Sequence, residues 1–359
     1  MVKEDIFSGL KSDDGILIRN GGEGSTDKAF TYLSGAVGGL FENSSIIASK
    51  DRIKLYVFSL EEQTARATGL DVEVAGSVKQ MNENLQKDLK GVRKIGLNFD
   101  SLTVNLLKET EKLLPGVEFF DASKNIMEAR MVKSKEEIAR LQEAAKISSE
   151  IYHGILSSLK EGMKETEVAA LMNYRMMQAG ASGVGFDTIV CFGENSAEPH
   201  HSPGDRKLKK GDYVLTDYGA KYKDYTADTT RTAVFGKATS EQKEIYSIVY
   251  RAQSESMNMI KPGINGKLVN QKSYDVIDAT KYKGRLMHGV GHGIGLDVHD
   301  HSAFGSSDFT IKENMAVTVE PGIYIPGFGG VRIEDDVLVT KQGYRLLTAA
   351  PPKDLIEVI

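Results

Sequence analysis

The sequence contains one cysteine, Cys191, among its 359 residues, and it contains no tryptophan. A single cysteine excludes a disulfide bond within the chain and a cysteine-rich metal site. Free cysteines usually behave as small buried apolar residues. We therefore expect Cys191 to be a buried strand residue rather than a nucleophile.

Long apolar runs and blocks of positive charge are also missing. No stretch reaches the ~20 apolar residues of a membrane-spanning helix, and the first residues lack the apolar segment of a signal peptide. The net charge of −5 and the absence of a Lys/Arg block give no basic surface for nucleic acid. We expect a cytoplasmic protein that binds neither membranes nor nucleic acid.

Strand and helix patterns alternate in the first third of the chain, which is typical of a small α/β domain. A length of 359 residues is sufficient for this domain and a second one. Gly21 to Gly24 lack the Lys-Ser/Thr pair of a phosphate loop, so we expect an ordinary loop there. The predicted strands are residues 15–19, 53–58, 95–99 and 117–120, and the predicted helices are 78–89 and 103–114.

The pattern changes to long helices near residues 129–133. Ser134 followed by Glu137 is a capping box, which predicts a helix that starts there. Further helices are predicted over 165–178 and 240–260. His153 has no acidic or histidine partner at helical spacing, so we interpret it as structural. We expect domains at 1–127 and 128–359 and an α+β fold class.

Two predicted hairpins in the second domain each carry a pair of acids. If the first turn centres between Tyr222 and Lys223, Asp217 and Asp228 are equidistant from it. In the second, Glu320 and Glu334 are equidistant from Gly327. Like charges directly opposite on paired strands are destabilising. Bound cations are the simplest remedy for two such pairs.

Between the hairpins lies a glycine-rich segment with histidines, from His288 through His292 to His299. Alternate glycines make a helix unfavourable, so we expect an extended or looped segment. Four carboxylates with an imidazole suit two divalent ions, and their oxygen and nitrogen donors favour manganese, cobalt, iron or zinc.

These segments, in this order, resemble the pita-bread metallopeptidases, which include prolidase, aminopeptidase P, methionine aminopeptidase and the metal-free creatinase. The resemblance implies a C-terminal pita-bread domain preceded by a smaller creatinase/prolidase-type α/β domain. The matching runs are Pro199-His200-His201, Gly211 to Ala220, Asp228 to Thr232, His288 to Asp300, Thr318 to Gly322, and Gly330 to Asp335.

The resemblance also implies the roles of individual residues. A metal-bound water loses a proton more readily, and Glu320 is the expected acceptor of that proton. His200 and His299 are expected to act with it in catalysis, and we interpret His201 and His301 as surface or rim residues. The implied metal ligands are Asp217, Asp228, His292, Glu320 and Glu334, and the implied substrate-binding residues are His288, Tyr324 and Arg332.

The implied reaction is hydrolysis of the Xaa-Pro bond of dipeptides, as in prolidase, by a homodimer. The alternative is aminopeptidase P, which releases the first residue of longer Xaa-Pro peptides. Some prolidases carry an arginine soon after the position of His299, but here none precedes Arg332. A non-catalytic binding protein and a creatinase-type enzyme are disfavoured, because all five metal ligands are present. Asn314 replaces a usual glycine, and asparagine tolerates the left-handed conformation.

Overall fold

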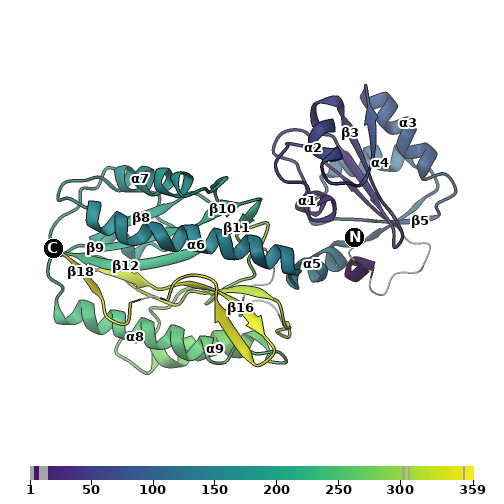
Figure 1. Ribbon diagram of the computed structural model, residues 1–359. Helices are drawn as coiled ribbons and strands as arrows, with labels where there is room; N and C mark the ends of the chain where they lie inside the picture. The colour runs from purple at the N-terminus through teal and green to yellow at the C-terminus, as the bar shows by residue number, and fades with distance from the viewer. Residues whose placement is uncertain (1–3, 8–14, 301–303, 306–307, 351) are drawn as a thin grey trace. The chain divides into compact units, whose positions relative to one another are not determined.

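The computed structural model describes residues 4–7, 15–300, 304–305, 308–350 and 352–359 (Figure 1). Its internal contacts divide the chain into two compact units, Met1–Arg130 and Met131–Ile359. The expected boundary between residues 127 and 128 falls inside helix α5, Ser123–Met131, which ends at this division. None of the helices in the described ranges combines the length and apolar character that a membrane span requires.

The N-terminal unit is built on one mixed sheet with the strand order β4-β3-β2-β1-β5-β6. The helices cover it through apolar side chains such as Met81 and Leu85 of α3, which are buried. The strands are β1 Gly15–Arg19, β2 Ser45–Ala48, β3 Ile53–Phe58, β4 Asp71–Ala75, β5 Lys94–Leu97 and β6 Glu118–Asp121. The helices are η1 Glu4–Phe7, α1 Lys28–Ser34, η2 Ser59–Glu61, α2 Glu62–Arg66, α3 Val78–Asp88 and α4 Val104–Leu113.

The predicted elements of this unit are confirmed within a few residues. The helices α3 and α4 begin where Ser77 and Thr103 accept hydrogen bonds from backbone N–H groups of the first turn, as capping residues do. The sequence analysis did not predict β2, β4, α1 or α2. All of these except α1 are at most five residues long, so they carry too little periodicity to identify.

Long helices flank the strands of the C-terminal unit. Figure 1 shows α6 and α7 on one side of these strands and α8 and α9 on the other. The predicted capping box of α6 is confirmed, because Ser134 and Glu137 exchange both hydrogen bonds. The helix α9 was not predicted. The helices are α6 Lys135–Ser158, α7 Glu165–Gln178, η3 Gly193–Ala197, α8 Ser240–Met257 and α9 Gly266–Asp278.

The strands of this unit form several small sheets with the orders β11-β10-β7, β18-β12-β9-β8, β13-β16-β17 and β14-β15. Cys191 lies buried in β8, as predicted. The strands are β7 Gly183–Val184, β8 Ile189–Phe192, β9 Tyr213–Tyr218, β10 Ala220–Tyr222, β11 Tyr225–Thr226, β12 Thr229–Phe235, β13 Ala316–Val319, β14 Gly322–Ile325, β15 Gly329–Arg332, β16 Asp335–Thr340, β17 Gly343–Leu346 and β18 Ile356–Val358.

The predicted register of the first acid hairpin is wrong by two residues on one strand, because the turn lies one residue further along the chain than predicted. Asp217 is paired with Thr230, not with Asp228. The turn centres between Lys223 and Asp224, whose φ angles are 46° and 68°. Two residues with positive φ are typical of the tight turn that suits strand twist. Asp228 therefore lies diagonally from Asp217, in the break between β11 and β12.

The predicted register of the second hairpin is confirmed. Pairs such as Gly322↔Arg332 in β14–β15 centre on Gly327, and Val319↔Asp335 in β13–β16 continues the same register. Glu320 and Glu334 thus lie opposite each other in the gap between the two ladders. Because neither residue is part of the paired strands, both side chains can turn toward the first hairpin.

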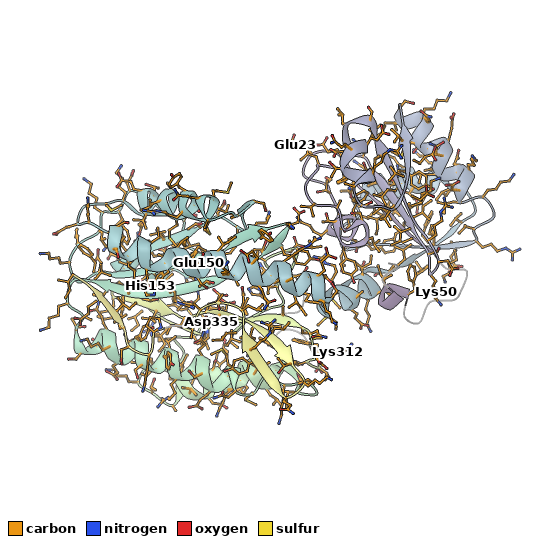
Figure 2. The ribbon with its side chains drawn as sticks, in the orientation of Figure 1. Glu23, Lys50, Glu150, His153, Lys312 and Asp335 are labelled. Carbon is orange, nitrogen blue, oxygen red and sulfur yellow. The ribbon has the colours of Figure 1, made fainter. Side chains whose placement is uncertain are left out.

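Two smaller expectations also agree with the structure. Asn314 has a φ of 66°, which is the left-handed conformation that asparagine tolerates. His153 is exposed on α6 (Figure 2) and does not line the cavity that holds the acids.

The close approach of Gly219 to the chain around Asp228 gives a test of this fold. A Cβ atom at Gly219 would lie 1.7 Å from the Ala227 carbonyl oxygen. We expect Gly219→Ala to lower the free energy of unfolding by about 1–3 kcal/mol, as overpacking does, in urea titrations followed by circular dichroism. The matched control is Gly183→Ala in β7, where an added Cβ meets nothing within 4 Å. Equal stability of the two variants would contradict this account.

Candidate metal centre

Three buried side chains from separate parts of the C-terminal unit converge on one point. Asp228, His292 and Glu334 each offer a ligand atom within 4.8 Å of the others. The Nε2 atom of His292 lies 3.7 Å from Asp228 Oδ2 and also 3.7 Å from Glu320 Oε1. Nitrogen and carboxylate donors at these distances suit a divalent metal ion.

Backbone contacts between the two hairpins fix the carboxylates. Asp228 donates its backbone N–H to Asp336 Oδ2 over 2.9 Å. Glu334 donates its N–H to the Thr230 carbonyl over 3.1 Å, and its Oε2 accepts from the Thr230 hydroxyl over 2.7 Å. Each hairpin therefore positions an acid of the other. This mutual dependence explains why the site needs both.

The glycine-rich segment brings His292 against β13. His292 donates its backbone N–H to Thr318 Oγ1 over 3.0 Å and accepts from the Thr318 N–H over 2.8 Å. A Cβ atom at Gly291 would lie 2.1 Å from the Thr318 carbonyl oxygen, so only glycine permits this approach. His292 Nδ1 lies 3.0 Å from the Gly293 carbonyl. Donation to that carbonyl leaves Nε2 as a free ligand atom.

Asp217 is not one of the three residues in the compact group. Its Oδ2 accepts from Arg332 Nη2 over 2.7 Å. Arg332 Nη1 also donates to the Tyr324 hydroxyl over 3.0 Å, and this hydroxyl lies 2.7 Å from His288 Nε2. Asp217 is thus tied through Arg332 and Tyr324 to His288, which lines the same cavity.

The electrostatics of this group reflect burial of several acids together. Burial and the charge of Glu334 raise the pKa of Asp228 well above its usual range. Burial and the charge of Glu320 do the same to the pKa of Glu334. Burial raises the pKa of Glu320 to about 8. In contrast, burial and the neighbouring His299 lower the pKa of His292 to about 4, which keeps the imidazole neutral and able to bind metal.

Three carboxylate oxygens test whether a metal fits here. Among the described residues, four carboxylate oxygens are buried without a hydrogen-bond partner, and three of them belong to expected ligands: Asp217 Oδ1, Asp228 Oδ1 and Glu334 Oε1, with Asp336 Oδ1 as the fourth. An unsatisfied buried carboxylate oxygen is costly, and bound divalent cations would satisfy these three. The residues present therefore fit a metal site.

The site opens into a cavity of about 280 Å³. Apolar side chains form part of its wall, at Phe186, Ile189, Pro199 and Val298. Tyr324 and Glu334 are fully or almost fully buried and do not line the cavity. The other residues that the sequence predicted for the site line the cavity directly: His200, Asp217, Asp228, His288, His292, His299, Glu320 and Arg332.

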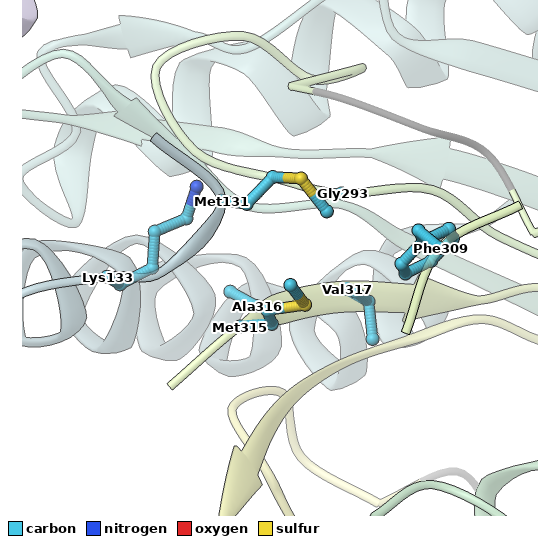
Figure 3. A pocket seen from close by; sticks show the side chains of 7 residues that line it. All are labelled: Met131, Lys133, Gly293, Phe309, Met315, Ala316 and Val317. Atoms are coloured by element: carbon cyan, nitrogen blue, oxygen red, sulfur yellow. The ribbon is translucent and has the colours of Figure 1, made fainter. Parts of the chain in front are cut away.

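A second cavity lies beside Gly293, behind the histidine segment. Figure 3 shows it lined by apolar side chains of Met131, Phe309, Met315 and Val317. Its volume of about 10 Å³ is near the minimum that holds one water molecule. It cannot hold a peptide, so substrate binding belongs to the larger cavity.

Sequence reasoning missed several supporting residues. Arg231 is buried, donates to the Glu334 carbonyl, and pairs with Asp335 Oδ1 at 2.6 Å; Asp335 lies inside the unit (Figure 2). The sequence signal that could have identified Arg231 was an arginine within a strand, β12, whose other residues are small or apolar. The interpretation of His201 as a surface or rim residue holds only in part, because 15% of its side chain is exposed but its ring bonds to the fully buried Glu165 at 3.0 Å. His301 lies outside the described residues.

Comparisons with known proteins agree with this geometry. The model of metallopeptidase family M24 matches residues 139–341, and the model of the creatinase/prolidase N-terminal domain matches residues 11–132. The chain belongs to metallopeptidase family M24. The expected architecture is confirmed: a pita-bread domain of family M24 follows a creatinase/prolidase-type N-terminal domain.

Several proteins that match this chain over most of its length are named as peptidases of Xaa-Pro substrates. A Xaa-Pro dipeptidase of Pyrococcus horikoshii is 38% identical over 319 residues, which are 88% of this chain and 89% of that protein. The structure of a Xaa-Pro dipeptidase from Bacillus anthracis has a TM-score of 0.90 at 34% identity, covering 99% of this chain and 98% of the other. An X-Pro aminopeptidase from Thermotoga maritima matches with a TM-score of 0.90 at 34% identity, covering 96% and 97%.

The raised pKa values of the acids predict how the stability of the metal-free protein depends on pH. Above pH ~6.5 histidines whose pKa is lowered are neutral in both the folded and unfolded states. Glu320, with a folded pKa of about 8, then holds a proton that it loses on unfolding. The free energy of unfolding should fall between pH 6.5 and 8.5, by up to ~1.4 kcal/mol per pH unit for each such carboxyl group.

Urea unfolding of chelator-treated protein at several pH values would measure this slope. Glu320→Gln is the control, because it removes one of the titrating groups and should flatten the slope. A stability that rises over this range would show that the acids are ionised in the metal-free fold.

Proposed function

We propose that this family M24 protein is a Xaa-Pro dipeptidase that uses two divalent metal ions. The observation that carries the proposal is the convergence of Asp228, His292, Glu320 and Glu334, of which all but the buried Glu334 line a cavity. The similarity to two Xaa-Pro dipeptidases over most of the chain supports this choice of substrate.

Five residues would hold the metals: Asp217, Asp228, His292, Glu320 and Glu334. Bound divalent ions would lower the pKa of a water molecule and polarise the substrate carbonyl. The unpartnered oxygens of Asp217, Asp228 and Glu334 support two ions better than one, because Asp217 lies outside the compact group. We propose that the ions are manganese, cobalt, zinc or iron, since the donors are oxygen and nitrogen.

Glu320 is the proposed general acid–base. A carboxylate beside a metal-bound water is within hydrogen-bond reach of the proton that the water gives up, which general base catalysis requires. The Glu320 side chain is 18% exposed, so it reaches the cavity where the substrate binds. Glu320 would accept the proton of the attacking water and deliver it to the leaving proline nitrogen.

The histidines on the cavity wall would hold the peptide. His200 and His299 are exposed to the cavity, and burial lowers the pKa of His299, which favours the neutral ring. We propose that they donate hydrogen bonds to the substrate carbonyl as negative charge develops on it. His288 would contact the substrate while Tyr324 and Arg332 hold its ring in place.

Aminopeptidase P activity is the second candidate. Arg332 is the only lysine or arginine among the described residues that line the cavity, and it already contacts Asp217, Tyr324 and the Pro199 carbonyl. A dipeptide places its carboxylate within this cavity, whereas a longer peptide does not. The similarity to an X-Pro aminopeptidase also supports this candidate.

We further propose that the protein is a cytoplasmic homodimer, as the sequence and the family resemblance suggest.

The preferred substrate length separates the two candidates. Protein loaded with Mn²⁺ should hydrolyse Xaa-Pro dipeptides with a kcat/KM at least tenfold above that for the matched Xaa-Pro-Xaa tripeptides, a difference of ~1.4 kcal/mol. Release of the free amino acid is the measurement. A preference for the tripeptide would assign aminopeptidase P, and no hydrolysis of either by metal-loaded protein would contradict both.

Removal of one ligand should abolish activity while the fold remains. Asp228→Asn keeps the shape of the side chain but removes its charge, so bound metal per subunit and kcat should both fall. The loss in kcat should exceed the hundredfold or so that outer-shell partners of a metal cost. Elemental analysis and dipeptide hydrolysis would measure both. Glu150→Gln, at an exposed position of α6, is the control, and normal metal content in Asp228→Asn would exclude Asp228 as a ligand.

A further inference from the structure

Glu165 is a buried acid outside the metal site, and hydrogen bonds surround its carboxylate. It is the first residue of α7 and has no exposed surface. Its Oε1 accepts from the Phe192 N–H over 2.8 Å and from Asn195 Nδ2 over 2.9 Å. Its Oε2 accepts from His201 Nε2 over 3.0 Å and from the Gly204 N–H over 3.0 Å.

All four donors belong to residues 192–204, which join β8 to the segment before β9. The carboxylate is far from these residues in sequence but touches both ends of the loop, at Phe192 and at Gly204. One side chain therefore fixes the shape of the whole loop. An ionised acceptor makes each of these bonds stronger than a neutral one.

His201 links this acid to a second one. Its Nδ1 lies 3.0 Å from Glu198 Oε2, while its Nε2 bonds to Glu165. Burial lowers the pKa of His201, but the hydrogen bonds to Glu165 and Glu198 outweigh it and raise the pKa above the usual value. A protonated ring can donate to both carboxylates at once.

The other side of the same loop forms part of the cavity wall. Pro199 and His200 line the cavity, and the Pro199 carbonyl accepts from Arg332 Nη1 over 3.3 Å. Ser196 Oγ accepts from the Gly330 N–H over 2.7 Å. The loop is thus held between Glu165 on one side and the β14–β15 hairpin on the other, with His200 next to His201.

We propose that Glu165 and His201 are positioning residues, which set the place of His200 and of the Pro199 carbonyl in the catalytic cavity. This inference rests on the proposed dipeptidase activity. A buried acid contributes little net stability compared with an apolar residue of the same size. The arrangement of four donors around one carboxylate instead specifies a single loop conformation.

Glu165→Gln is the sharpest test, because it preserves size and replaces one oxygen with an N–H₂ group. Two of the four groups that donate to Glu165 would then face the N–H₂ group of glutamine, which is itself a donor. We expect faster backbone hydrogen exchange confined to residues 192–204, and a fall in kcat of roughly a hundredfold, the cost of a misplaced catalytic group. KM and bound metal should change less than about threefold.

Glu167→Gln is the matched control, since Glu167 lies in the same first turn and is exposed, and its side chain accepts from the Lys164 N–H at the helix start. His201→Gln provides a second variant in case Glu165→Gln does not fold. It removes one bond to Glu165 and should give the same pattern at smaller amplitude.

The outcomes separate this inference from the proposed function. If the parent protein hydrolyses no Xaa-Pro peptide, the proposed function fails, and exchange confined to residues 192–204 still supports the loop-positioning role of Glu165. If the parent is active and Glu165→Gln matches Glu167→Gln in kcat and exchange, the inference is overturned. Exchange that rises throughout the C-terminal unit would also overturn it, because Glu165 would then be a general structural residue.

Discussion

The mutual repulsion of buried carboxylates is the constraint on which the C-terminal unit depends. The ligand atoms of Asp228, His292 and Glu334 lie within 4.8 Å of one another, and two unit charges about 5 Å apart repel by about 3 kcal/mol at an effective dielectric of 20. In the absence of cations the acids respond by keeping protons, as their raised pKa values indicate. Metal ions that replace these protons would turn repulsion into attraction, so the site is built for cations.

The fold maintains this arrangement with two arginines that bracket the acids. Arg231 holds the backbone at Glu334 and pairs with Asp335, whereas Arg332 holds Asp217 from the cavity side. Both are buried. They supply fixed positive charge near the acids without occupying the point where the ligand atoms converge. A lysine could not replace either one, because each guanidinium group donates to several acceptors at once.

Buried polar groups also hold the residues that line the cavity. The residues that would touch substrate are themselves held by buried polar groups: His288 by Tyr324, and the loop of His200 by Glu165. Catalytic geometry of this kind needs support from a surrounding layer of hydrogen bonds. These buried polar groups therefore hold residues of the site in position.

The sequence by itself determined the elements with strong local signals and the chemistry of the site. The sequence could predict the long helices such as α6 and α7 and the capping box at Ser134. It also showed the acids and histidines in their order along the chain. Each of these features depends on residues close in sequence. Only the tertiary structure decided the pairing of Asp217 with Thr230, the approach of Gly291 to Thr318, and the hydrogen bond of His201 to the buried Glu165. These depend on turn geometry and on contacts between residues far apart in the chain, which no local pattern records.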